Sequence, residues 1–94
     1  MSTPHSQGTR VEQVIFEVAD GERMTIAVEP IAYQLDFIGR TTVVVRGELE
    51  PGESLEFSLG VLNGNPFLQY WPNGNHTIEA NGKIVDQSIE PNSD

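Results

Sequence analysis

The chain contains no cysteine and only two histidines among its 94 residues. Without cysteine it can form neither a disulfide framework nor a thiolate metal site. A zinc site needs three or four converging ligands, whereas His5 and His76 stand alone in the sequence, and we expect His76 at a surface turn. A Ser or Thr nucleophile needs a positioned base, which only His76 or the single Lys83 offers. We therefore expect no metal, no cofactor and no enzymatic activity.

Long apolar runs are also missing. No stretch approaches the roughly 18 residues that a membrane-spanning helix needs. Residues 1–8 lack the basic start and the apolar core that mark a signal peptide. From these features we expect no membrane segment and no export, and hence a cytoplasmic or phage-associated protein.

Basic residues are scarce. Five Lys and Arg stand against fourteen Asp and Glu, which gives a net charge of -9. A surface this negative repels phosphate backbones, so we expect no direct binding to nucleic acid. The charge is compatible with three explanations: solvation alone, a basic protein partner, or imitation of a nucleic acid.

The length of 94 residues predicts one domain. We expect flexible tails over residues 1–9 and 90–94 and a single domain over residues 10–89. This core is small, so close packing or a partner must supply much of its stability.

Apolar and polar residues alternate along most of the chain, which is typical of half-buried β-strands. The expected strands cover residues 11–19, 23–29, 31–38, 41–50, 55–61, 67–71, 77–80 and 83–89. Residues 31–38 also fit a helix that begins after Pro30, but the alternation favours a strand. With no room for crossover helices, the pattern predicts an all-β fold with antiparallel connections. We expect a small β-sandwich or a meander barrel of seven to eight short strands.

Turn residues separate the expected strands. Residues 20–22 predict a three-residue hairpin loop, because this register sets apolar residues opposite one another. The pairs that it predicts are Val18 with Met24, Phe16 with Ile26, and Val14 with Val28. Asn81-Gly82 predicts a two-residue hairpin turn that pairs Ile78 with Val85 and Glu79 with Ile84.

Four carboxylates gather around the Pro51-Gly52 turn: Glu48, Glu50, Glu53 and Glu56. Repulsion among them could raise one pKa, and their oxygens could surround Ca²⁺. The sequence does not contain the alternating Asp pattern of a calcium loop, and the strand alternation favours a solvated sheet face. We interpret these residues as an acidic region that can steer a basic partner.

An aromatic segment between two Asn-Gly-Asn turns is the best candidate for a working surface. It contains Phe67, Tyr70 and the only tryptophan, Trp71. Leu68 and Tyr70 point to one side of the expected strand, and Phe67, Gln69 and Trp71 point to the other. Either one side is core and the other is covered by a loop or tail, or Tyr70 or Trp71 is exposed beside Asn73 and Asn75 as a binding anchor.

These features favour a non-enzymatic, acidic protein-binding module, such as an inhibitor, an immunity-like protein, an adaptor or an assembly subunit. The expected partner-binding residues are Tyr70, Trp71, Asn73, Asn75, Glu48, Glu50, Glu53 and Glu56. The expected partner is a basic protein, and a homo-oligomer is also compatible with the sequence. One alternative is a carbohydrate-binding module that stacks sugars on Tyr70 and Trp71 beside Asn73 and Asn75. The other alternative is a nucleic-acid mimic that occupies a basic groove.

Overall fold

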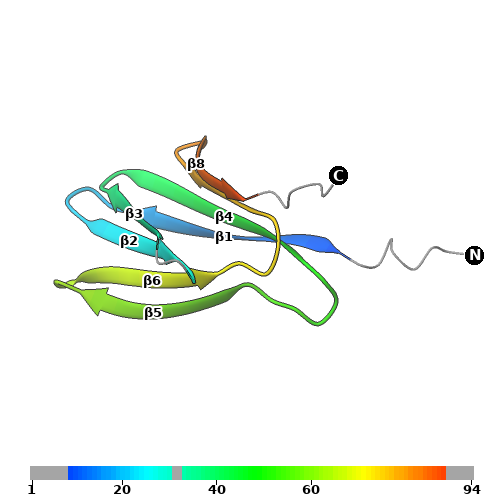
Figure 1. Ribbon diagram of the computed structural model, residues 1–94. Helices are drawn as coiled ribbons and strands as arrows, with labels where there is room; N and C mark the ends of the chain where they lie inside the picture. The colour runs from blue at the N-terminus through cyan, green and yellow to red at the C-terminus, as the bar shows by residue number, and fades with distance from the viewer. Residues whose placement is uncertain (1–8, 31–32, 89–94) are drawn as a thin grey trace, which may run out of the picture.

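The protein folds into eight β-strands (Figure 1), and its computed structural model describes residues 9–30 and 33–88. The strands are β1 (Arg10–Val18), β2 (Arg23–Val28), β3 (Tyr33–Ile38), β4 (Thr41–Leu49), β5 (Glu56–Leu62), β6 (Asn65–Trp71), β7 (His76–Ala80) and β8 (Lys83–Ser88). Within the described ranges there is no helix. The predicted all-β fold is confirmed.

The strands form two four-stranded sheets, which we call sheet A and sheet B. Sheet A has the order β1-β4-β7-β8, and sheet B has the order β3-β2-β6-β5. In Figure 1, β4 and β1 of sheet A lie above β6 and β5 of sheet B, as expected for two sheets packed face to face. This arrangement is a sandwich, one of the two architectures that the sequence predicted.

The core lies between the two sheets. In sheet A, the β-branched run of β4 places Val43 and Val45 inward, and Ile78 lies beside Val45 on β7; all three have no exposed surface. In sheet B, Ile26 and Leu68 are paired neighbours on β2 and β6 and are both buried. Single apolar faces of alternating strands therefore build the core, as period-two patterning requires.

The predicted hairpin between the first two strands is wrong. β1 pairs with β4, where Val18 faces Thr41, and β2 pairs with β3, where Met24 faces Phe37. The predicted pairs Val18–Met24, Phe16–Ile26 and Val14–Val28 therefore do not form. β1 and β2 instead belong to different sheets. The prediction failed because two strands with one apolar face each can bury those faces either side by side in one sheet or across the sandwich.

The link between β1 and β2 packs tightly against the turn between β3 and β4. The Gly39 amide donates to the Glu22 carbonyl at 2.9 Å, and the Arg40 amide donates to the Val18 carbonyl at 2.7 Å. These two hydrogen bonds hold the connection that carries the chain from sheet A to sheet B.

One strand pair departs from the predicted antiparallel connectivity. β2 and β6 run parallel, with Thr25 opposite Phe67 and Val28 opposite Tyr70. A parallel pair needs a long connection, and here the intervening chain includes β4 in the other sheet. The expectation of antiparallel pairs throughout assumed that neighbouring strands stay within one sheet.

Both Asn-Gly turns form, including the hairpin turn that the sequence predicts at Asn81-Gly82. Asn63-Gly64 and Asn81-Gly82 all have positive φ angles, between 51° and 84°, as a two-residue hairpin turn requires. The predicted pair Glu79–Ile84 is confirmed. The predicted pair Ile78–Val85 is wrong, because an irregularity between Ile78 and Glu79 shifts the register so that Ile78 faces Asp86.

Residues 31–38 were ambiguous in the sequence. The described part, Tyr33–Ile38, is a strand, as the alternation favoured. Ile31 and Ala32 lie outside the described residues, and so do most of the expected tails at residues 1–9 and 90–94.

Candidate functional site

Tyr70 is part of the core, so its predicted role as an exposed anchor is wrong. Only 1% of the residue is exposed. Its ring stacks on Phe57 at a centroid distance of 5.0 Å and meets the ring of His76 edge-on at 5.6 Å. β6 is an interior strand between β2 and β5. The contact with His76, a residue of β7, shows that the Tyr70 side chain points towards sheet A.

The buried phenol of Tyr70 makes stability depend on alkaline pH. Burial raises its pKa to about 12 from a usual value of 10.0. Between these values the unfolded chain loses a proton that the folded chain keeps, so stability falls as the pH rises from about 10 to about 12. We expect this group to cost about 2 kcal/mol of unfolding free energy across the window.

Urea unfolding at a series of pH values between about 9 and 12 tests this dependence. Tyr70→Phe keeps the stacked ring and removes the ionisable group, so its stability should fall less steeply than that of the wild type. Equal slopes for the two proteins would contradict the assignment to Tyr70.

Trp71 lies on the outer face of sheet B, because it follows the inward Tyr70 on the same strand. It is half-buried and pairs with Glu56 of β5. On its other side, the Glu29 amide donates to the Tyr70 carbonyl at 2.8 Å, which extends the parallel ladder by one residue. The Gln69 amide group donates to the Glu29 carboxylate at 3.0 Å. Trp71 is therefore flanked by two carboxylates, Glu29 and Glu56.

Phe67, Gln69 and Trp71 form a row along β6 that we call the aromatic stripe. All three side chains are half-buried on the outer face of sheet B. Their neighbours on β2 include Thr25 and Ala27, which are small and almost fully buried. The stripe therefore shields the middle of β2 and still presents aromatic surface to solvent.

The predicted acidic region is divided between the two faces of the sandwich. Glu48 lies on the outer face of sheet A, whereas Glu56 lies on the outer face of sheet B. Between them, the Glu53 carboxylate accepts the Glu50 amide at 2.8 Å. The Arg10 side chain donates to the main-chain oxygens of Glu50 and Glu53. The sequence interpretation missed Arg10, which lies about forty positions away and comes close only through the pairing of β1 with β4.

The two candidate asparagines lie in the link between β6 and β7. Asn73 is exposed, and its amide group donates to the Ser54 carbonyl at 3.4 Å. The amide group of Asn75 donates to the Glu48 carboxylate at 3.3 Å, on the side of sheet A. With Tyr70 buried, the four residues expected to bind a sugar do not form one platform.

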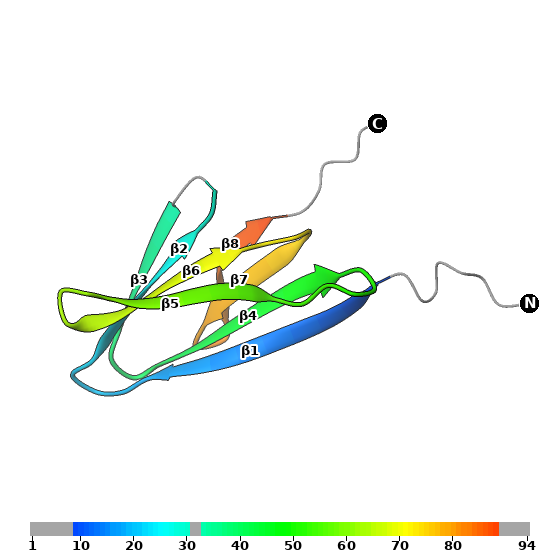
Figure 2. The same cartoon turned by 90° about the horizontal axis from the view of Figure 1, so that it is seen from below.

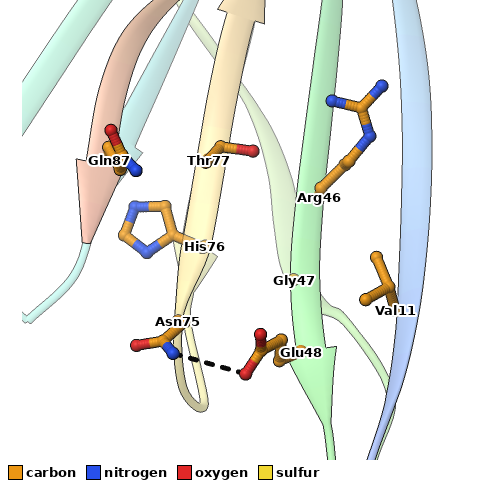
Figure 3. A pocket seen from close by; sticks show the side chains of 8 residues that line it. All are labelled: Val11, Arg46, Gly47, Glu48, Asn75, His76, Thr77 and Gln87. Carbon is orange, nitrogen blue, oxygen red and sulfur yellow. Dashed lines mark hydrogen bonds between the residues drawn. The ribbon is translucent and has the colours of Figure 1, made fainter. Parts of the chain in front are cut away.

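A hollow of about 360 Å³ lies beside β4, β7 and β8 (Figure 3). It is lined by Val11, Arg46, Gly47, Glu48, Asn75, His76, Thr77 and Gln87. Figure 3 shows the Glu48–Asn75 hydrogen bond at one end, and Arg46 at the other end extends between β4 and β1. The guanidinium of Arg46 already binds Glu79 and Gln13.

His76 is buried, contrary to the expectation of a surface turn. Its Nε2 atom lies 2.8 Å from the Asp86 carboxylate, while its buried Nδ1 atom has no hydrogen-bond partner among the residues that the structure describes. The alternation of His76 with Ile78 and Ala80 on one side of a strand was the sequence signal for this position. Among residues 9–30 and 33–88, no three His, Cys, Asp or Glu side chains are grouped to hold a metal ion.

Comparisons with protein-family models, with curated protein sequences and with solved structures found no match. In the part of the chain that the structure describes, no helix is long and apolar enough to cross a membrane.

Proposed function

We propose that this protein is a protein-binding module that receives a cationic side chain of a basic partner at Trp71. The observation that carries the proposal is the position of Trp71 between Glu29 and Glu56 on the outer face of sheet B. An indole face attracts an ammonium or guanidinium group, and carboxylates on both sides can bind its N–H donors.

Local charge supports a cationic ligand. Among the strands of sheet B, the only basic residue is Arg23, and it lies at the end of β2 away from Glu29. The net charge of -9 adds a long-range attraction for a basic protein and speeds its approach. Phe67, farther along the aromatic stripe, offers apolar surface to the residues beside the bound cation.

The proposal can be tested by capturing partners from an extract of the source cells. The purified partner is then titrated into this protein to measure the dissociation constant. Trp71 is the only tryptophan, so its fluorescence reports directly on binding at the site. We expect Trp71→Ala to weaken binding by about thirtyfold, since aromatic anchors at interfaces contribute about 2 kcal/mol or more. Ile84→Ala is the matched control, because Ile84 is 50% exposed on the other sheet.

Charge variants separate this site from non-specific attraction. Glu29→Gln and Glu56→Gln keep the side-chain shape, and each should weaken binding and reduce its dependence on salt. Glu48→Gln removes the same charge from the outer face of sheet A and should have a smaller effect. Equal effects of all three variants, or unchanged binding by Trp71→Ala, would overturn the proposal.

The other functions stay predictions from the sequence. No contact among the described residues favours carbohydrate binding, since Tyr70 and Asn75 lie apart from the exposed side of Trp71. Nucleic-acid mimicry needs an ordered array of carboxylates, and Glu48 and Glu56 lie on opposite faces of the sandwich.

A further inference from the structure

We propose that a second copy of this chain binds along β5 and forms a two-fold symmetric dimer through that edge of sheet B. The starting observation is an exposed apolar surface at the end of the β5–β6 hairpin. Leu59 and Val61 are 74% and 75% exposed, although they lie on the same side of β5 as Phe57, and Leu59 pairs with the buried Leu68 of β6. Leu59 and Val61 are not part of the Trp71 site, which shares only Glu56 with β5, so the inference does not rest on the proposed function.

Leu59 and Val61 lie on the same side of β5 as the core residue Phe57, but farther along the strand. Phe57, at the start of β5, packs against Phe16 of β1 at a ring distance of 5.8 Å. Farther along the hairpin, the turn between β5 and β6 extends past the ends of β1 and β4 in both views (Figures 1 and 2). The tip of the hairpin therefore extends beyond the ends of these two strands of sheet A. The exposure of Leu59 and Val61 shows that no strand among the described residues covers them.

The edge of β5 also lacks the charges that protect sheet edges from pairing. The other three edge strands are β1, β3 and β8, and each carries charge at or near its middle or at several positions. β5 carries one charge, Glu56, at its first residue, and residues 57–62 are uncharged. An uncharged apolar edge strand is a template for another strand.

A second copy is favoured because the sequence of β5 is symmetric about Leu59. Antiparallel pairing around a two-fold axis at Leu59 places Phe57 opposite Val61 of the partner, so large apolar residues meet on the inner side. On the outer side, the same axis places Ser58 opposite Gly60 of the partner. One strand thus supplies both halves of a self-complementary interface, as two-fold symmetry requires.

The charges of two such acidic chains are compatible with this pairing. The axis separates the two Glu56 residues by six positions along the paired strands, which is about 20 Å at the usual strand rise. This distance exceeds the Debye length of about 8 Å at physiological ionic strength. The repulsion between the two Glu56 carboxylates is therefore largely screened. Added salt should tighten the dimer, because it also screens the general repulsion between two chains that each carry a net charge of -9.

Sedimentation equilibrium tests the dimer directly. The wild-type mass should rise from 10.4 kDa towards twice that value as the concentration is raised to about 1 mM. Val61→Lys should raise the dissociation constant about a hundredfold, because the interface would then bury an unpaired ammonium group. Val11→Lys adds the same charge at a 63% exposed residue of β1 and should stay dimeric.

Cysteine cross-linking tests the register in a chain that has no cysteine of its own. The axis sets Leu59 opposite Leu59 of the partner, so Leu59→Cys should form a disulfide-linked dimer under mild oxidation. Val11→Cys, at a site of similar exposure, should cross-link far less.

A wild-type chain that stays monomeric at about 1 mM would overturn the proposal. The β5 edge would then be left to another occupant, either a tail of the same chain or a different protein. A dimer that persists in Val61→Lys, or that dissociates in Val11→Lys, would also overturn it by placing the interface elsewhere. The Trp71→Ala variant should dimerise as the wild type does, so failure of the dimer and failure of the Trp71 site can be told apart.

Discussion

Gly39→Ala should destabilise the protein by about 3 kcal/mol, as expected when a side chain is forced against packed atoms that cannot move aside. A Cβ atom at Gly39 would lie 2.7 Å from the Ala19 carbonyl oxygen, 2.8 Å from the Gly21 nitrogen and 3.0 Å from the Asp20 Cα. All three atoms belong to the main chain. The same link is held by the Gly39–Glu22 hydrogen bond, so relief of the clash would disrupt the crossing from β1 to β2.

Gly60→Ala is the matched control. A Cβ atom there would meet no atom closer than 3.9 Å, and Gly60 lies in a regular strand, where Ala is the better residue. Urea unfolding should therefore show Gly60→Ala within about 0.5 kcal/mol of the wild type. Equal losses at Gly39 and Gly60 would contradict the close approach of the β1–β2 link.

Ile78→Ala should cost about 3 kcal/mol, because Ile78 is fully buried and the smaller side chain leaves a cavity. In a chain of this size each kcal/mol lowers the melting temperature by about 4–8 °C, so thermal unfolding should shift by roughly 10–25 °C. Ile78 lies beside Val45 in the middle of sheet A, and the surrounding strands leave little freedom to close the gap.

Val85→Ala tests the register of the last hairpin. A regular hairpin would set Val85 opposite Ile78, on the core side, and its truncation would then cost a substantial part of the loss at Ile78. The observed shift leaves Val85 37% exposed, so we expect a cost below about 0.5 kcal/mol. A loss at Val85 similar to that at Ile78 would contradict the irregularity between Ile78 and Glu79.

Taken together, the two proposals describe a bivalent binding surface. Antiparallel pairing of two β5 strands would place the outer faces of both copies of sheet B on the same side of one continuous sheet. Each copy would then present its own Trp71 between Glu29 and Glu56. A partner with two basic segments would gain from binding both sites at once.

Most strand positions follow from the amino-acid sequence. The β-branched run at residues 41–45, the alternation along residues 55–61 and the two Asn-Gly turns each specify a local conformation. These signals depend on steric preferences within a few residues, so they do not require knowledge of the rest of the chain. The all-β class and the candidate strand around Trp71 were predictable for this reason.

Strand partners and the use of each face depend on contacts distant in sequence. The alternation of β1 and β2 is satisfied equally by pairing within a sheet and by packing across the core, so the sequence did not exclude the hairpin that fails to form. The same ambiguity applied to Tyr70 and Trp71, which point to opposite sides of β6. Packing of sheet A against sheet B buries Tyr70 and leaves Trp71 outside, because one side of a central strand must supply the core.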